Sequence, residues 1–377
     1  MKANKIMNNK KSISLFSGAG GMDIGIRQAG FDVLAEIELD EHCISTLRAA
    51  AARDNLKTNV IHADIKTIDE NVLMSELNIK NGELDLLFGG PPCQSFSLAG
   101  KQLGLCDARG QLLFEIIRFA KKIKPKVILI EQVKGLLSSK GENNRRGEVF
   151  ETFLTSLENI GYTPKWKVIM AADFGVPQLR ERLFVVATRG KNGFNFPERT
   201  HATVEECGEL FSFSPHVGVG EVINDLGIPS PKVRGKTVYD REDSHVDVTP
   251  ERDRERIEKV PEGSHLAAQV HLGEELRRGL SPKDTTKYLR LHRSRPSNTL
   301  RCGEIFYHPT ENRYLTPREC MRIHGYPDNY YLKGPIRSRT GTVRNLDQHR
   351  QVANSVPPPL ARILAIQIAR YLDEQDF

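Results

Sequence analysis

The chain has 377 residues, of which 39% are apolar and 27% charged, and its formal net charge is +6. These values are ordinary for a globular protein and leave room for one large domain and a smaller one. No apolar run approaches the ~18–20 residues that a membrane helix needs, and the basic N-terminal stretch lacks the apolar segment of a signal peptide. We therefore expect a cytoplasmic protein with no membrane partner.

Short apolar runs alternate with helical patterns through the first half of the chain. Buried strands are predicted at 12–17, 33–37, 59–62, 84–88 and 127–130, and a helix at 112–122. Two more strands, at 168–171 and 183–187, are close enough in sequence to form a hairpin. This alternation predicts an α/β fold, a doubly wound and mostly parallel sheet with helices on both faces.

The alternation stops near Arg189. Residues 190 to about 296 are irregular and rich in Pro, Gly, His and charge, apart from a helix start at Thr249-Pro250-Glu251. Helical patterns return at 316–324 and over 351–373. We expect one domain built from residues 1–189 and 340–377, and a smaller one from 190–339.

Basic side chains concentrate between Leu276 and Arg301, where eight Lys and Arg residues face a single acid, Asp284. Most charge runs are solvated faces, but one this one-sided favours contact with a polyanion. The six cysteines are scattered without a CxxC pair, which indicates neither a zinc site nor a disulfide framework. A cysteine in such a setting is usually a small buried hydrophobe.

Candidate ligand-binding residues follow the first three predicted strands. The first strand runs into the glycine-rich segment FSGAGG at 16–21, and Glu38 and Asp64 follow the second and third strands. Glycines allow close backbone approach, and a carboxylate in this place can hold a ribose, so an adenosine-type cofactor is predicted. A nicotinamide dehydrogenase remains an alternative, although FSGAGG lacks the G-x-G-x-x-G spacing. The aromatic ring of Phe16 suits a positively charged sulfonium.

The fourth strand leads into Gly89-Gly90-Pro91-Pro92-Cys93. Two prolines stiffen the approach to the cysteine and fix where its thiol points. The polar segment 97–110 contains three glycines, which predicts a mobile lid. A purely structural cysteine would explain neither the rigid approach nor the flexible exit.

Six segments, in chain order, resemble motifs of the bacterial DNA (cytosine-5) methyltransferase family. They are FSGAGG at 16–21, PPCQSFS at 91–97, IEQV at 130–133, QLRER at 178–182, RPSNT at 295–299 with TPRE at 316–319, and ANSVP at 353–357. Two positions depart from the family pattern. Gln132 stands where the family usually has Asn, which makes the geometry of the nucleophile loop an open question, and Ala353 replaces a common Gly.

The resemblance implies a Rossmann-like methyltransferase fold that uses S-adenosylmethionine as methyl donor and no metal. It implies that Cys93 adds to carbon 6 of a flipped cytosine in duplex DNA. The implied catalytic residues are Cys93, Glu131, Arg180 and Arg182. The implied cofactor-binding residues are Phe16, Gly18, Gly20, Gly21, Glu38, Leu39, Asp64, Ile65, Pro91, Asn354 and Ser355. The implied DNA contacts are Ser97, Arg109 and Thr299.

The resemblance also sets expectations for the domains and the partners of this chain. It makes 1–189 with 340–377 the catalytic and cofactor-binding domain, and 190–339 the target-recognition domain, with 277–301 as its DNA-facing part. We expect a monomer, associated with the nucleoid through DNA. A separate restriction endonuclease as partner and a solitary enzyme are both open, and the target sequence is not readable.

Two further interpretations stay open. An RNA cytosine-5 methyltransferase of the DNA-enzyme-like type would share nearly every catalytic motif, but its distinctive Cys-Phe-Thr motif is missing from this sequence. A catalytically inactive binding protein would tend to lose the nucleophile or its partners, whereas Cys93, Glu131 and Arg182 are all present here.

Overall fold

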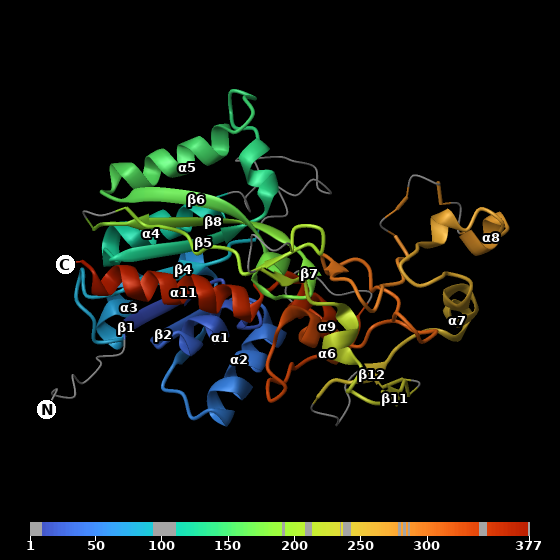
Figure 1. The fold of residues 1–377 in the computed structure, drawn as a ribbon. Helices are drawn as coiled ribbons and strands as arrows, with labels where there is room; N and C mark the ends of the chain where they lie inside the picture. Colours follow the sequence, from blue (N-terminus) through green and yellow to red (C-terminus); the bar gives the residue numbers. More distant parts are fainter. Residues whose placement is uncertain are drawn as a thin grey trace, which may run out of the picture.

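A computed structural model describes residues 10–92, 111–190, 193–207, 213–233, 235–236, 243–277, 280–281, 284–285, 287–338 and 345–375. Its largest element is a seven-stranded sheet in the order β3-β2-β1-β4-β5-β8-β6 (Figure 1). The strands are β1 (Lys10–Leu15), β2 (Phe31–Glu38), β3 (Asn59–His62), β4 (Leu86–Gly89), β5 (Val127–Gln132), β6 (Thr163–Met170) and β8 (Glu181–Thr188).

Strands β1 to β5 pair in parallel, and β8 lies antiparallel between β5 and β6. This mostly parallel sheet confirms the predicted fold class, including the hairpin of β6 and β8. Because the parallel strands all end at the same edge, the loops after β1, β2, β4 and β5 gather there. Some of the predicted site residues, among them Phe16, Gly18 and Pro91, lie on those loops.

Helices cover both faces of the sheet. They are α1 (Gly21–Gln28), α2 (Glu41–Arg53), α3 (Glu70–Glu76), α4 (Leu112–Ile123), α5 (Glu148–Asn159) and α11 (Pro358–Asp373), with the 3₁₀ helices η1 (Ile65–Thr67), η3 (Lys134–Ser138) and η4 (Ala171–Phe174). In Figure 1, α4 and α5 lie on one side of the strands and α1 and α11 on the other.

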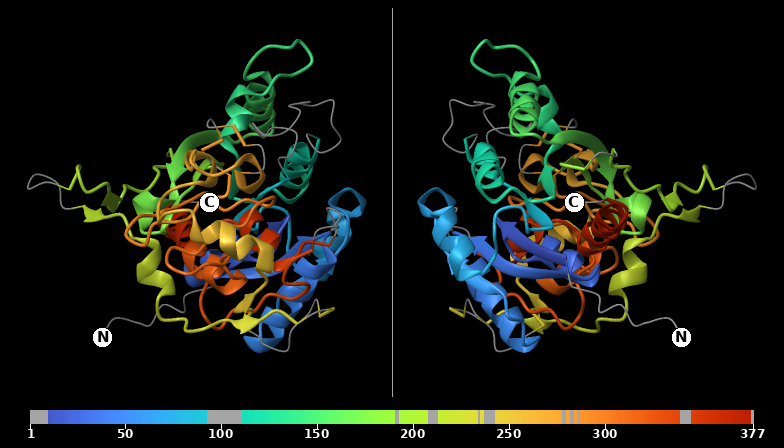
Figure 2. Two further views of the ribbon diagram at one scale, coloured as in Figure 1. Left: turned by 90° about the vertical axis from the view of Figure 1, so that its right-hand side faces the viewer. Right: turned by 90° about the vertical axis from the view of Figure 1, so that its left-hand side faces the viewer.

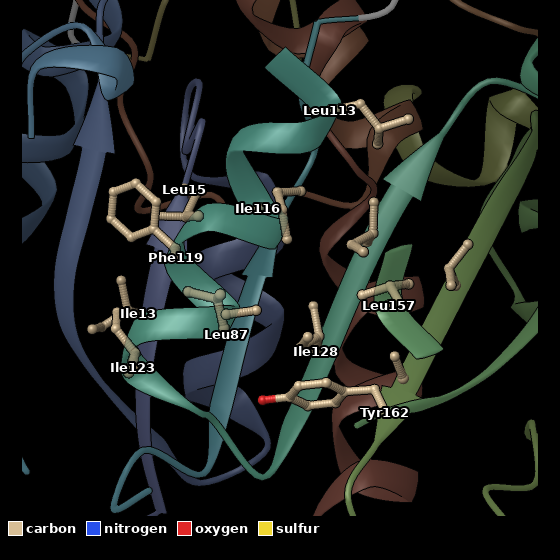
Figure 3. Close-up of a cluster of buried hydrophobic side chains, with 14 of the residues drawn as sticks. Ile13, Leu15, Leu87, Leu113, Ile116, Phe119, Ile123, Ile128, Leu157 and Tyr162 are labelled. Carbon is tan, nitrogen blue, oxygen red and sulfur yellow. The ribbon is translucent and has the colours of Figure 1, made fainter. Parts of the chain in front are cut away.

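The central strands are buried on both faces because successive side chains point in opposite directions. In β5, Ile128 and Ile130 face the cluster formed with α4 and α5, whereas Val127 and Leu129 face the cluster formed with α1 and α11. Helix α4 presents one apolar side to the first cluster, and its side chain Phe119 is fully buried there (Figure 3).

The predicted helix over 351–373 is wrong in one respect. The structure has two helices there, α10 (Gln348–Asn354) and α11, separated by Ser355, Val356 and Pro357. Three consecutive prolines at 357–359 explain the break, since proline has no N–H to donate and restricts the residue before it to extended backbone. Because of the break, the Ser355 carbonyl accepts from side chains instead of from a helical N–H, and Ser355 is part of the site described below.

Residues beyond β8 form smaller elements, seen to the right in Figure 1. These are β9 (His201–Ala202), β10 (Ser214–Pro215), α6 (Val219–Ile223), β11 (Ser230–Pro231), β12 (Val246–Asp247), α7 (Glu251–Glu258), η5 (Leu266–Ala268), α8 (Glu274–Arg277), β13 (Ser297–Asn298) and α9 (Pro317–His324), and the short strand β7 (Gln178–Leu179) lies just before β8. The ribbon of β9 and β10 projects from the body in both views of Figure 2.

Buried side chains between Val219 and Leu332 form another cluster, which also takes in Val352 and Ala353 of α10 and Ala19, Ile24 and Ala50 from the first part of the chain. Strand β13 pairs in parallel with β7, so the later segment is joined to the chain just before β8. The cluster thus packs against α1 and α2, and the division of the chain into two domains, with boundaries at 190 and 339, stays a prediction.

We predict that Phe119→Ala lowers the free energy of unfolding by about 3–5 kcal/mol, because the ring is fully buried and its removal leaves a cavity. Urea unfolding followed by circular dichroism measures the change. The control Val72→Ala, at a side chain that is 56% exposed, should stay within about 0.5 kcal/mol of the parent. A similar loss in both variants would contradict the packing described.

Candidate active site and cofactor pocket

A pocket opens at the edge of the sheet where the parallel strands end. It lies between the loop after β1, the start of α1, the end of β4, and the segment that follows α10. Its lining residues are Ser14, Leu15, Phe16, Ser17, Gly18, Gly21, Met22, Asp23, Phe88, Gly89, Gly90, Glu131, Asn354, Ser355 and Val356. Five of the predicted cofactor-binding residues are therefore brought together with Glu131.

The glycine-rich loop is shaped by its neighbours. Phe16 and Gly18 both have left-handed backbone, with φ of 57° and 55°. For Phe16 this conformation is unfavourable, and such outliers concentrate at functional sites. A Cβ on Gly21 would lie 2.4 Å from the Val356 carbonyl oxygen, so only glycine allows α1 to begin against that segment. A Cβ on Gly18 would meet nothing within 4 Å, which leaves space beside it in the pocket.

Glu38 ties the ends of β1 and β2 together. One carboxylate oxygen accepts a hydrogen bond from the Gly18 amide at 2.7 Å, and the other accepts from the amides of Leu39 at 2.7 Å and Asp40 at 2.8 Å. Burial raises the pKa of the Glu38 carboxyl, and these backbone bonds oppose that effect. The carboxylate is thus fixed beside the glycine-rich loop, where the sequence placed a ribose contact.

Neither Glu38 nor the remaining predicted cofactor residues line the described pocket. Gly20 caps α1, and Asp64 caps η1 through the Lys66 amide. Ile65 packs into the core beside α3 and is 4% exposed, whereas Leu39 is 38% exposed beside Glu38. Pro91 is buried at the last described residues before the nucleophile segment. Their contacts with a cofactor stay predictions.

Glu131, which lines the pocket, forms an ion pair with Arg182. The Arg182 Nε lies 2.9 Å from Glu131 Oε1, and both side chains are nearly buried. They are neighbours because β5 and β8 are antiparallel with Glu131 opposite Phe184, two residues from Arg182, so the pair shares one face of the sheet. Glu131 Oε2 would lie 3.2 Å from a Cβ on Gly90, so this glycine keeps the carboxylate accessible.

The uncommon Gln132 reaches the start of the nucleophile segment. Its amide nitrogen donates to the Pro91 carbonyl oxygen at 2.9 Å, and its amide oxygen accepts from the Val133 N–H at 3.2 Å. The extra methylene therefore does not prevent the amide from holding this backbone. Three other predicted residues, Cys93, Ser97 and Arg109, lie outside the described part of the chain.

Arg180 is 2% exposed and does not line the pocket. Its guanidinium donates to the carbonyl oxygens of Ala353 at 3.1 Å and Ser355 at 2.9 Å. It thus holds the break between α10 and α11, next to Asn354, the last residue of α10, which lines the pocket. Arg180 acts here on the backbone of the cofactor side.

In the described residues, no group of three or more His, Cys, Asp or Glu side chains could hold a metal ion. Nor is any helix of the described chain long and apolar enough to cross a membrane.

Comparison with known proteins decides the family. The model for C-5 cytosine-specific DNA methylase matches residues 10–370. The chain belongs to the C-5 cytosine-specific DNA methylase family. It is 32% identical to the Type II methyltransferase M1.HphI of Haemophilus parahaemolyticus, over 94% of this chain and 85% of that protein. It is 34% identical to the Type II methyltransferase M.PspPI of Psychrobacter sp., over 96% of this chain and 79% of that protein.

Solved structures agree on the fold of this methylase. A prophage-encoded E. coli protein described as a DNA modification methyltransferase superposes with a TM-score of 0.69 at 21% identity, covering 97% of this chain and all of that one. Spodoptera frugiperda DNMT2 superposes with a TM-score of 0.53 at 18% identity, covering 95% and 99% of the two chains. At these identities the likeness concerns the fold alone.

The basic run of the methylase divides between structural and exposed roles. The interpretation of 277–301 as DNA-facing is wrong for Arg290, which is 8% exposed and donates to the carbonyl oxygens of Ile257 at 3.1 Å and Val260 at 3.0 Å. Arg293 is paired with Glu262 at 2.9 Å. Arg295 and Arg301 are exposed, and the Thr299 hydroxyl donates to the Leu179 carbonyl oxygen at 2.7 Å.

Sequence reasoning missed two buried acids beneath the glycine-rich loop. Asp23 of α1 is fully buried at the pocket, and Glu36 of β2 is 1% exposed and paired with Arg27 at 2.7 Å. Burial, followed by the charge of Asp23, raises the pKa of Glu36 to about 7, and burial raises the pKa of Asp23 as well. One arginine thus faces two carboxyls, so the cluster holds a proton below neutral pH.

We predict that Asp23→Asn stabilises the methylase above pH 7 and has little effect below pH 5. With raised carboxyl pKa values the native state binds more protons than the unfolded chain, so the free energy of unfolding falls as pH rises from about 4.3 to about 7. The substitution leaves Glu36 with Arg27 alone, which should recover about 1–3 kcal/mol at pH 8. Urea unfolding at pH 5 and pH 8 measures this. A variant whose stability declines in parallel with the parent would contradict it.

We predict that Gln132→Leu lowers the rate of methyl transfer about tenfold while the affinity for S-adenosylmethionine is kept. The change leaves the Pro91 carbonyl without its amide donor, a loss of about 1–2 kcal/mol in loop placement. Transfer of a radiolabelled methyl group to bacterial DNA gives the rate, and calorimetry gives the affinity. Gln132→Asn retains an amide, so its rate of methyl transfer should lie between the rates of the parent and of Gln132→Leu. Parental rates in Gln132→Leu would refute the role.

Proposed function

We propose that this enzyme methylates carbon 5 of a flipped cytosine in a specific duplex DNA sequence, through a covalent bond between Cys93 and carbon 6. The observation that carries the proposal is that Glu131 lines the same pocket as the glycine-rich loop and is ion-paired with Arg182. An acid and a cation at one sheet edge can bind the hydrogen-bonding edge of a pyrimidine. The family supports methyl transfer to cytosine, and the proposal adds the residues and the course of the reaction.

The proposed chemistry follows from the electronic structure of cytosine. Carbon 5 is a poor nucleophile until the Cys93 thiolate adds to carbon 6 and makes the ring enamine-like. Glu131 would bind N3 and the exocyclic amino group, which selects cytosine, and would assist attack when protonated. Arg182 would stabilise negative charge that develops on O2. After methylation, loss of the carbon 5 proton allows the bond to Cys93 to break.

S-adenosylmethionine would supply an electrophilic methyl group. The free space beside Gly18, the ring of Phe16 and the fixed carboxylate of Glu38 suit the methionine portion, the sulfonium and the ribose, respectively. Gly20, Gly21 and Ser355 would shape the pocket, with Asn354 contacting the cofactor. Leu39, Asp64, Ile65 and Pro91 are proposed for the adenine side and the pocket floor, and Arg180 for holding the Ser355 backbone.

The second unit, 190–339, is proposed to recognise duplex DNA. Thr299 and the exposed arginines of the basic run would contact the phosphate backbone, as would Ser97 and Arg109. The relatives are named Type II methyltransferases. We therefore propose that a separate restriction endonuclease of the same specificity accompanies the enzyme. We also propose that the enzyme works as a monomer in the cytoplasm and uses no metal.

A covalent trap tests the nucleophile. In DNA of several kilobases made with 5-fluorocytosine, the fluorine at carbon 5 cannot leave as the proton does. We therefore predict an adduct that is stable to denaturing electrophoresis when S-adenosylmethionine is present. Cys93→Ala should abolish the adduct, whereas the matched control Cys207→Ala, at a half-buried thiol outside the pocket, should retain it. An adduct that survives Cys93→Ala, or none with the parent enzyme, would refute the mechanism.

Parallel assays on unmethylated bacterial DNA and on tRNA separate the two substrate classes. The proposal requires methylation of duplex DNA, and activity on tRNA alone would overturn it. Bisulfite sequencing of the methylated DNA would then identify the target sequence and the cytosine within it.

A further inference from the structure

We propose that His324 is a positioning residue. It holds Ser355, at the cofactor side of the pocket, in register with Thr299 and Leu300, which are here called the recognition segment because the proposed function assigns Thr299 to DNA contact. His324 ends helix α9 within the unit 190–339 and is fully buried. The inference rests on the proposed function in one respect, because it takes Asn354 and Ser355 as part of the cofactor pocket.

The imidazole of His324 bridges two partners. One ring nitrogen, Nε2, lies 2.9 Å from the Ser355 carbonyl oxygen, and Nδ1 lies 2.9 Å from the amide nitrogen of Gln178. A carbonyl only accepts, so Nε2 carries the proton and Nδ1 accepts from the Gln178 amide. Burial, together with the nearby Arg180 charge, holds the pKa of His324 well below its usual value. The ring is therefore neutral, and this one tautomer satisfies both partners.

Gln178 extends the bridge to the recognition segment. Its amide oxygen accepts from the Leu300 N–H at 3.1 Å, directly after Thr299. The strand β7 that carries Gln178 also pairs with β13. A continuous path of hydrogen bonds thus runs from Leu300 through Gln178 and His324 to Ser355.

The far end of this path is the pocket itself. Ser355 and Asn354 both line it, and the Ser355 carbonyl also receives the Arg180 guanidinium at 2.9 Å. A second contact links the same two segments, since the Cys302 thiol lies 2.7 Å from the Asn354 amide oxygen. Loss of the His324 ring would leave the Ser355 carbonyl with one donor fewer and free the loop to shift from the cofactor.

His324→Leu, measured by calorimetry with S-adenosylmethionine and no DNA, tests the proposal. We expect the dissociation constant to rise about tenfold, as for a buried acceptor that loses a hydrogen bond. His324→Gln can donate to Ser355 and accept from Gln178, so it should stay within about threefold of the parent. This rescue would not follow from a role in packing alone, since Leu and Gln fill similar volumes.

The matched control is His245→Leu. His245 is fully buried and makes the same kind of contacts, with the Thr316 hydroxyl at 2.9 Å and the Gly227 carbonyl oxygen at 3.1 Å, but it does not line the pocket. It should lower the melting temperature as His324→Leu does and leave the dissociation constant unchanged. If His324→Leu does not fold, Gln178→Leu removes the ring's partner and should weaken binding in the same direction.

The proposal is overturned if His324→Leu, or Gln178→Leu in its place, binds the cofactor like the parent. It is also overturned if His245→Leu weakens binding as strongly, because the effect would then follow stability. A parent enzyme that does not bind S-adenosylmethionine at all would instead refute the proposed function.

Discussion

The ion pair between Glu131 and Arg182 is the interaction on which the site depends. Two charges that are nearly buried require each other, because removal of either would leave an uncompensated charge in a low-dielectric setting. Their meeting requires the antiparallel insertion of β8 beside β5, which places both side chains on one face of the sheet. It also requires Gly90, since a larger residue would crowd the carboxylate. The one antiparallel strand within an otherwise parallel sheet thus has a chemical consequence at the pocket.

Three side chains of the short segment Gln178 to Arg182 each make a different structural contact. Arg182 holds the acid of the pocket wall, Arg180 holds the backbone at the break after α10, and Gln178 connects that break to the recognition segment through His324. The break itself exists because of consecutive prolines, which cannot donate helical hydrogen bonds and so leave the Ser355 carbonyl to accept from Arg180 and His324. The ion pair at the pocket, the backbone after α10 and the segment at Leu300 are therefore all held by this short stretch of chain. In this enzyme, a substitution at Gln178 or Arg180 would therefore alter the positions of all three parts.

Much of the fold could be predicted from the sequence because strand ends and glycine-rich turns are local signals. The strands at 59–62 and 127–130 lie where expected, and Phe16, Glu131 and Asn354 meet in one pocket. Long-range contacts carried no such signal. Arg290 stands in a basic run that predicts a polyanion contact, yet backbone carbonyls distant in sequence bury it. His324 has the pattern of a helix-terminal cation, and only the packed structure shows that it is neutral and bridging. Gln132 donates to the Pro91 carbonyl at the start of the nucleophile segment, but the loop beyond residue 92, whose geometry was in question, lies outside the described residues.

The most direct test of the central claim is release of tritium from carbon 5 of cytosine in duplex DNA without a methyl donor. Attack by Cys93 at carbon 6 makes carbon 5 basic, so its hydrogen should exchange with water whenever the base is bound and activated. The account predicts enzyme-dependent release with the parent chain, a marked loss with Glu131→Gln, and none with Cys93→Ala. Release that persists at the parental rate after either substitution would contradict it.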